Sequence, residues 1–294
     1  MNNRLGKKAV FTGWLILGFL GALFLAPDAQ AYQVKRVITG LVNLGTAVEA
    51  TTIDLVATGK LVSGDVLDVN KSVLFITRSV TDAANERTVR MNIMAMIDDP
   101  THLLFSRRTA GPVMNIEYAI VEFTADSDVM VYAGMTTVPE TIYYKNITLP
   151  ANIVLAKSFP LLTTRTVLAI NGNDEQEIFM GELTGTQTLR IDRSDVANSA
   201  NTDVAYQVVA FGSTEADVNV QSGTFIFDNS TGTGETSDLN GTVTVGITSI
   251  DPAKSFLVFT LNPAVSCNGL DDLYAIEGTV TNDTTLTFYR AVTS

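Results

Sequence analysis

Alternation between apolar and polar residues is the dominant pattern of this chain. In the run 284–290, TTLTFYR, Leu286 and Phe288 fall on one side of an extended strand, and Thr285 and Thr287 fall on the other. Two runs, Ile116–Phe123 and Phe256–Leu261, are apolar on both sides, which predicts central strands or strands under a neighbouring domain. After residue 31 no stretch keeps an apolar stripe of helical period. The pattern therefore predicts an all-β fold.

Turn-forming residues separate these runs at regular intervals. They occur at Asp98–Pro100, Thr184–Gln187 and Thr281–Thr284, where Asp, Asn, Gly and Pro favour tight reversals of the backbone. Short alternating strands joined by such turns are typical of antiparallel β-sandwiches.

Two landmarks recur three times in the same order along the chain. One is a Lys-Ser pair before an apolar strand, and the other is a strand that ends in arginine. The lysines are Lys71, Lys157 and Lys254, and the arginines are Arg107, Arg193 and Arg290. Both series advance by 86 residues and then by 97. Landmarks that move in step indicate internal repeats.

A third landmark follows the arginine in the first two copies: apolar strands at 116–123 and 204–211 keep the same spacing of Tyr and Phe. A leading strand ending near Gly40, Gly134 or Gly223 opens each copy. We therefore expect three diverged, tandem antiparallel β-sandwich domains, each large enough for its own core. They span 32–125, 126–213 and 214–294.

The third copy has four residues after Arg290, so its closing strand is predicted to be missing. Such a gap would leave unpaired backbone groups to which another chain can add a strand, giving head-to-tail assembly. Two alternatives stay open: a sandwich that closes with fewer strands, or a sequence truncated before its natural end.

The first 31 residues have the three regions of a secretory signal peptide. A basic start with Arg4, Lys7 and Lys8 precedes 17 apolar residues, 9–25, and a small-residue cleavage motif at Ala29–Ala31. We expect cleavage before Tyr32 and a secreted, extracellular or cell-surface protein, with no membrane span after cleavage. An uncleaved membrane anchor is the alternative.

The net charge and the small numbers of Cys and His exclude several classes of function. The chain carries 19 Lys and Arg against 31 Asp and Glu. Because the signal contributes a net +2, the mature net charge moves from −12 to −14. An acidic chain does not suit sequence-blind binding of nucleic acid. One Cys and one His exclude an internal disulfide, a cysteine zinc cluster and a multi-histidine metal site.

Several of these segments resemble known families. The strand at 254–259, the hairpin Gly278–Phe288 and the strand Tyr206–Phe211 resemble a repeat of uncharacterised secreted bacterial and phage-associated proteins. The run Gln221–Gly223 and the order of strands are similar to H-type lectin domains. The second resemblance implies a six-stranded sandwich that binds N-acetylgalactosamine-type sugars as a trimer. The mature chain lacks the tryptophans typical of that family, and no sugar-binding residue is carried over.

Few residues offer catalytic chemistry. His102 lies in a turn-to-strand segment, and we interpret it as solvated turn filler because the other copies have neutral polar residues there. The adjacent pairs Asp98-Asp99 and Asp271-Asp272 do not suit acid–base catalysis, because neighbouring strand residues point to opposite faces. We therefore expect no enzymatic activity and no cofactor other than calcium.

Calcium is the metal that the sequence favours. The loop 171–177, NGNDEQE, gathers five oxygen donors, the atoms that calcium prefers: Asn171, Asn173, Asp174, Glu175 and Glu177. A solvated acidic loop is the alternative for this segment.

The three repeated arginines are the candidate ligand-binding residues. Arg107, Arg193 and Arg290 have the geometry to hold a carboxylate or sulfate, or to stabilise the fold of each copy. The same alternatives apply to the repeated lysines. Three tyrosines near the copy junctions have faces suited to sugar stacking, although burial between domains is the favoured interpretation; they are Tyr132, Tyr143 and Tyr144.

These observations together predict a secreted, non-enzymatic structural or interaction protein of the cell surface or of an extracellular assembly. Its partners are expected to be proteins or further copies of the chain. A carbohydrate-binding adhesin of the H-type lectin kind, with glycans as ligands, is the alternative.

Overall fold

The structure is a computed structural model that describes residues 34–80, 92–107, 111–166, 179–193, 201–212, 218–223, 242–259 and 276–290. This part of the chain is all-β: it contains antiparallel strands and two short 3₁₀ helices, and no α-helix. The all-β prediction is confirmed. The expected signal peptide, 1–31, lies outside the described residues. Neither helix in the described ranges has the length and apolar character needed to cross a membrane.

The first strand group, β1–β6, forms two three-stranded antiparallel sheets. Strand β6 is central in the order β1-β6-β3, and β5 is central in the order β2-β5-β4. The bounds are β1 Val34–Leu44, β2 Ala50–Asp54, β3 Ser72–Val80, β4 Met94–Asp99, β5 His102–Ser106 and β6 Met114–Phe123. The expectation that the apolar run at 116–123 is a central strand is confirmed.

The second strand group, β7–β12, also forms two three-stranded sheets. Their orders are β7-β12-β9 and β10-β11-β8, so β12 takes the position that β6 has in the first group. The bounds are β7 Val129–Val138, β8 Tyr144–Thr148, β9 Ser158–Thr166, β10 Phe179–Gly185, β11 Thr188–Arg193 and β12 Thr202–Phe211; the 3₁₀ helix η1, Leu155–Lys157, precedes β9.

The third strand group contributes one described sheet, of order β13-β15-β14. The bounds are β13 Thr242–Gly246, β14 Ile276–Asn282 and β15 Thr285–Arg290, and the 3₁₀ helix η3 is Pro252–Lys254. Residues 218–223 and 255–259 are not in strands. The predicted leading strand before Gly223 and central strand at 256–261 are therefore not found in these ranges, because no described segment pairs with them.

Three hairpins share one irregularity of register. The pairs β4–β5, β10–β11 and β14–β15 each have a single register shift near the turn, just before Asp99, Gly185 and Asn282. These three positions advance by 86 and then 97 residues, the spacing of the Lys-Ser landmark. The three segments thus share a local backbone geometry in addition to a sequence pattern.

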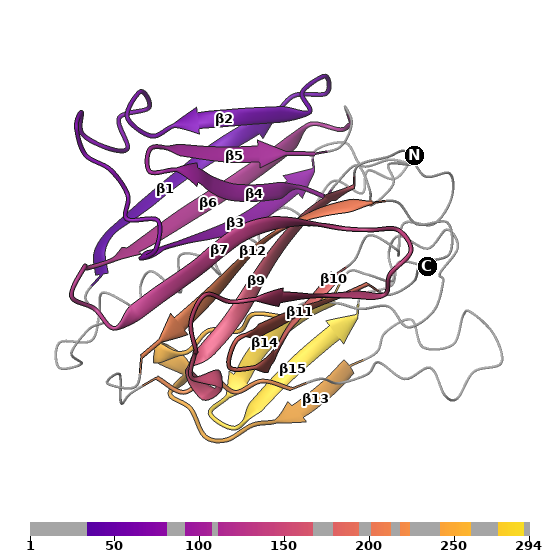
Figure 1. The fold of residues 1–294 in the computed structure, drawn as a ribbon. Helices are drawn as coiled ribbons and strands as arrows, with labels where there is room; N and C mark the ends of the chain where they lie inside the picture. The colour runs from indigo at the N-terminus through magenta and orange to yellow at the C-terminus, as the bar shows by residue number, and fades with distance from the viewer. Residues whose placement is uncertain are drawn as a thin grey trace, which may run out of the picture.

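Three clusters of buried side chains connect the sheets. One draws from both sheets of the first group, including Phe105 and Ile116, and one draws from both sheets of the second group, including Ile191 and Val208. The third joins the two groups and includes Val121 of β6. Figure 1 shows the sheets following one another from the indigo strands at the top to the yellow strands at the bottom. Strand β6 is therefore buried on both faces.

Polar side chains of the second group also attach to free strand edges of the first group. The Gln207 side-chain amide accepts from the backbone N–H of Leu74 at 2.8 Å and donates to its carbonyl at 2.9 Å. The hydroxyl of Thr163 makes the same pair of bonds to the backbone of Ala95, at 3.0 and 2.9 Å. These bonds satisfy backbone groups on β3 and β4 that no strand of the first group pairs.

Candidate functional site

Arg107 is buried and bonded inside the first strand group. Its side chain is among the largest that are fully buried, with the residue 1% exposed. Nε, Nη1 and Nη2 donate to the carbonyls of Val48, Pro112 and Gly45 at 2.8, 2.6 and 2.6 Å. The guanidinium therefore joins two loops of its own group, and it is not presented to a ligand in solution.

Arg193 has the same place in the second group. It is 2% exposed, and Nη2 donates to the carbonyl of Val138 and lies near the hydroxyl of Thr202, both at 3.2 Å. The backbone N–H groups of Arg107 and Arg193 also match, since they donate to the carbonyls of Glu49 and Tyr143 at 2.7 Å. Arg290 ends β15. The geometry of Arg107 and Arg193 favours the structural alternative.

The repeated lysines separate into buried and exposed members. Lys71 is 9% exposed, and its Nζ donates to the carbonyls of Ser127 and Val129 at 2.7 Å. Lys157 reaches the carbonyl of Gly212, at 3.4 Å. Lys157 thus binds backbone directly after β12, and Lys71 binds backbone at the start of β7. The Lys254 side chain is 57% exposed, and its Nζ lies 3.8 Å from the Asp251 carboxylate.

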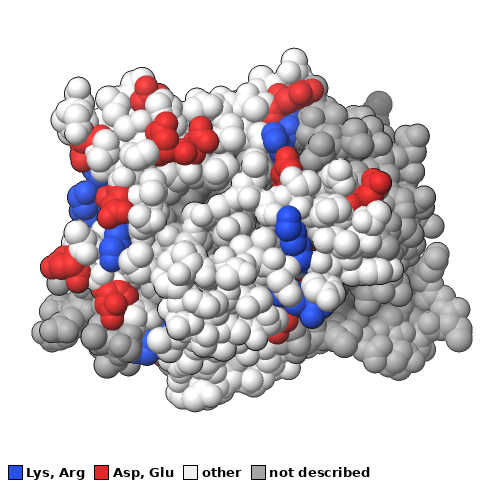
Figure 2. Space-filling model, in the orientation of Figure 1, with Lys and Arg blue, Asp and Glu red and all other residues white. Residues whose placement is uncertain are grey.

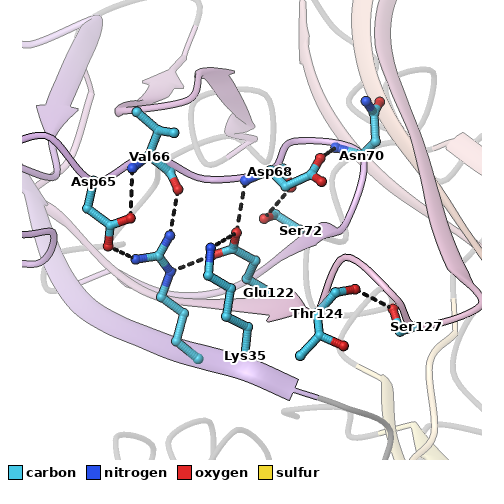
Figure 3. Close-up of polar contacts among 10 residues, drawn as sticks. Lys35, Asp65, Val66, Asp68, Asn70, Ser72, Glu122, Thr124 and Ser127 are labelled. Atoms are coloured by element: carbon cyan, nitrogen blue, oxygen red, sulfur yellow. Dashed lines mark hydrogen bonds and ion pairs between the residues drawn. The ribbon is translucent and has the colours of Figure 1, made fainter.

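A buried carboxylate was not predicted from the sequence. The Glu122 side chain on β6 is fully buried and accepts from Lys35 Nζ at 3.1 Å, from the backbone N–H of Asp68 at 2.9 Å and from Arg36 Nε (Figure 3). Arg36 also pairs with Asp65. Two cations balance the charge of Glu122 and the backbone N–H of Asp68 donates to it, so the cluster connects β1, β6 and the loop before β3. The sequence feature that could have indicated this buried site is a glutamate within an apolar run.

His102 and Asp99 form an exposed pair at the β4–β5 turn. His102 Nδ1 lies 2.8 Å from the Asp99 carboxylate. Bonds from the backbone N–H of Thr101 and from His102 lower the pKa of Asp99 to about 2. The hydrogen bond to Asp99 is the main factor that raises the pKa of His102 above 6.5. The Thr101 hydroxyl also donates to Asp99 at 2.9 Å and lies 3.0 Å from His102 Nδ1, so the three side chains form a local contact of the turn.

We expect the single histidine to titrate above pH 6.5 when followed by NMR, and Asp99→Asn to bring its pKa back toward 6.5. Asp54→Asn is the control, since Asp54 lies 3.8 Å away and acts through space alone. The raised pKa gives His102 a stabilising contribution that is complete below pH 6.5 and is lost as the pH rises through the folded-state pKa. Asp99 contributes in the opposite range, above pH 4, and loses its contribution as the pH falls toward 2. A His102 pKa at or below 6.5 in the unchanged chain would contradict the pair.

The junction tyrosines have different surroundings. Tyr132 packs against the second buried cluster. Tyr143 and Tyr144 are 55% and 50% exposed, so the expected burial between domains is wrong for them. The Arg190 guanidinium covers the Tyr144 ring at 4.4 Å and pairs with Asp192. Tyr143 and Tyr144 are thus exposed aromatic residues, and Arg190 covers one face of the Tyr144 ring.

The calcium prediction falls on residues 171–177, outside the described residues. Within the described ranges no group of three or more His, Cys, Asp or Glu side chains is placed to hold a metal ion. Charged residues on the face in Figure 2 stand in small groups of either sign around a broad uncharged area. Among the described residues of that face, Lys and Arg form no continuous patch.

Two glycines in leading strands lie under tyrosines of the central strands. Gly40 of β1 is opposite Tyr118 of β6, and Gly134 of β7 is opposite Tyr206 of β12. A Cβ at Gly40 or Gly134 would lie only 2.3 or 2.6 Å from the tyrosine hydroxyl, so the ring occupies that space. Gly223 has no described atom within 4 Å of the corresponding position.

Two segments of the third group make contacts like those of β7 and β9 in the second group. Val220 N–H donates to the carbonyl of Ala156 at 2.7 Å, as Val131 N–H of β7 donates to that of Asn70 at 2.8 Å. In the segment 255–259, Phe259 packs over Gly278 of β14. Leu162 of β9 packs over Gly181 of β10 in the same way. Val220 and Phe259 thus make contacts that correspond to those of Val131 in β7 and Leu162 in β9.

The described part of the third group does not include a counterpart of β12. In the second group β12 pairs with both β7 and β9. No strand among the described residues pairs with 218–223 or 255–259. No protein-family model, curated protein or solved structure matches this chain.

Proposed function

We propose that the chain is a secreted, non-enzymatic structural or interaction protein, built as three tandem β-sandwich copies and located at the cell surface or in an extracellular assembly. The basic, apolar and small-residue regions of 1–31 support secretion. The matched strand orders of the first two groups, and the register shift shared by all three hairpins, support the three copies.

The observation that carries the structural role is the set of contacts that the buried charged residues make. Arg107 and Lys71 are buried and donate to backbone carbonyls, and Glu122 is buried between cations. These groups stabilise the fold and the junction between copies, so they are not free for acid–base or nucleophilic chemistry. An array with such junctions behaves as a semi-rigid body suited to assembly.

Carbohydrate binding is the second candidate, and the exposed pair Tyr143 and Tyr144 favours it. The experiment is a glycan array together with light scattering on the purified mature chain. The structural role predicts large, stable oligomers or ordered polymers and no reproducible sugar binding. Reproducible binding of one sugar class, lost in Tyr144→Ala, would favour the adhesin. A monomer at high concentration would contradict the structural role.

A further inference from the structure

Asparagine stands two residues before a hydroxyl residue at several places in the described chain. Three triplets of the form Asn-x-Ser or Asn-x-Thr, with x other than Pro, lie wholly within the described residues and begin at Asn70, Asn146 and Asn282. In exported proteins this triplet is the acceptor signal for N-linked glycans, which lie at the surface. The triplets differ in how the fold presents the amide and the hydroxyl.

Asn282 lies at the exposed turn between β14 and β15. Residues 281–284 are all exposed. Asn282 Oδ1 accepts from the backbone N–H of Thr284 at 2.9 Å and from the Thr284 hydroxyl at 3.2 Å. Both bonds use the amide oxygen and neither uses Nδ2, the atom to which an N-linked glycan is attached. The fold thus presents the amide nitrogen and the hydroxyl of this triplet together at the surface.

The turn itself does not require asparagine. The carbonyls of Asp283 and Thr284 accept backbone N–H groups at 2.8 and 2.9 Å, and the matching carbonyls of the β4–β5 and β10–β11 hairpins accept at the same distances. The residue that precedes these carbonyls is Asp99 in the first hairpin, Gly185 in the second and Asn282 in the third. Because three different residues serve in the same turn, its geometry does not account for an asparagine.

We propose that Asn282 is a site of N-linked glycosylation. This inference rests on the secretion that the proposed function assigns to the chain, because the transfer takes place on the outer side of the membrane. The donor is a polyprenyl-pyrophosphate-linked oligosaccharide. Nδ2 forms a bond to the anomeric carbon of the first sugar and gives up one proton to a base of the transferase. The bond between that carbon and the pyrophosphate oxygen breaks, and polyprenyl pyrophosphate leaves with the electron pair.

The other two triplets are an internal comparison. On β8, Asn146 and Thr148 are both exposed, because alternate residues of a strand lie on the same face. Asn146 is therefore the second site that we expect. Asn70 is exposed, but Ser72 is 1% exposed and its hydroxyl donates to the carbonyl of Asp68 at 2.7 Å. Since the fold engages the hydroxyl of this triplet, we expect Asn70 to stay unmodified.

The test has two arms. In the first, the mature chain is recovered from the exported fraction of its source, and its peptides are sequenced by mass spectrometry. In the second, the purified, folded mature chain is incubated with an oligosaccharyltransferase and a polyprenyl-pyrophosphate-linked oligosaccharide, which tests the presentation of Asn282 without secretion. We expect the mass of a glycan on the peptide that contains Asn282 in both arms, and none on the peptide that contains Asn70.

Asn282→Asp removes Nδ2 and keeps the turn, since Asp99 accepts from the backbone N–H and the hydroxyl of Thr101 at 2.7 and 2.9 Å. This variant is expected to lose the glycan at position 282. It should unfold at the same urea concentration as the unchanged chain when both are tested without the glycan. Thr284→Val removes the hydroxyl and should also lose the glycan, whereas Thr284→Ser, its matched control, should keep it.

A bare Asn282 in the exported chain or in the second arm would overturn the proposal, and so would a glycan that occupies Asn70 as fully as Asn282 or persists in Thr284→Val. These outcomes are separable from the proposed function. An exported chain with a bare Asn282 keeps the proposed secretion and loses the glycan site. A chain that stays inside the cell with residues 1–31 attached, but is modified at Asn282 in the second arm, loses the secretion and keeps the acceptor site.

Discussion

Arg107→Met is expected to lower the free energy of unfolding of the first copy by about 3–5 kcal/mol, a larger loss than we expect from Glu122→Gln or Lys35→Met. The methionine fills part of the volume, but the carbonyls of Val48 and Pro112 lose the Arg107 donor, and the carbonyl of Gly45 keeps only the backbone N–H of Val48. Each buried carbonyl left without a donor costs about 1–3 kcal/mol before water enters. Urea unfolding followed by circular dichroism, with hydrogen exchange at β1 and β6, measures the loss.

Lys145→Met is the matched control for Arg107→Met. Lys145 also donates to a backbone carbonyl, that of Thr137 at 2.9 Å, but it does so at an exposed site. We expect a change below about 1 kcal/mol, because water replaces the lost donor. Equal effects of the two substitutions would show that the Arg107 bonds contribute no more than surface contacts.

Glu122→Gln is expected to destabilise the first copy by about 3 kcal/mol. The substitution keeps the shape of the side chain but removes the charge that balances Lys35 and Arg36. Because the carboxylate is fully buried, salt screens these interactions weakly. The loss should therefore be nearly the same at low and high salt in urea unfolding experiments.

Lys35→Met tests the exposed half of the same cluster. The Lys35 side chain is 46% exposed, so its removal is expected to cost less than about 1 kcal/mol. A small effect of Glu122→Gln, comparable to that of Lys35→Met, would indicate that the buried carboxylate is not needed for stability. A strong salt dependence of the Glu122→Gln effect would contradict its burial.

The sequence was sufficient to predict the strands that carry a local signal. Alternation of side chains along 284–290 predicted β15, and apolar residues on both sides of 116–123 predicted a central strand. Both predictions depend on which faces a strand buries, and a strand's own residues determine that. The run at 256–261 carries the same signal, but its described residues form no strand. Strand pairing needs a second segment, and the local pattern cannot supply one.

The side-chain hydrogen bonds to backbone groups were harder to predict, because they join residues that are far apart in the sequence. Gln207 and Leu74 are 133 positions apart, and no spacing rule links an amide side chain to the edge of a strand in another copy. The repeated arginines were found by their spacing, but their bonds to carbonyls depend on loops such as Gly45–Val48 that differ between copies. Glu122 stood out only as a charge in an apolar strand.

The attachment of Gln207 to β3 has a consequence for the order of folding. Until β12 is in place, the Leu74 peptide groups lack the side chain that satisfies them, so the first copy has an open sheet edge while the second is unfolded. Contacts over such sequence separations form slowly. The first copy, although it is synthesised first, therefore completes its hydrogen bonding only when the second has folded against it. Nascent chains released between these two events would be the species most prone to aggregation.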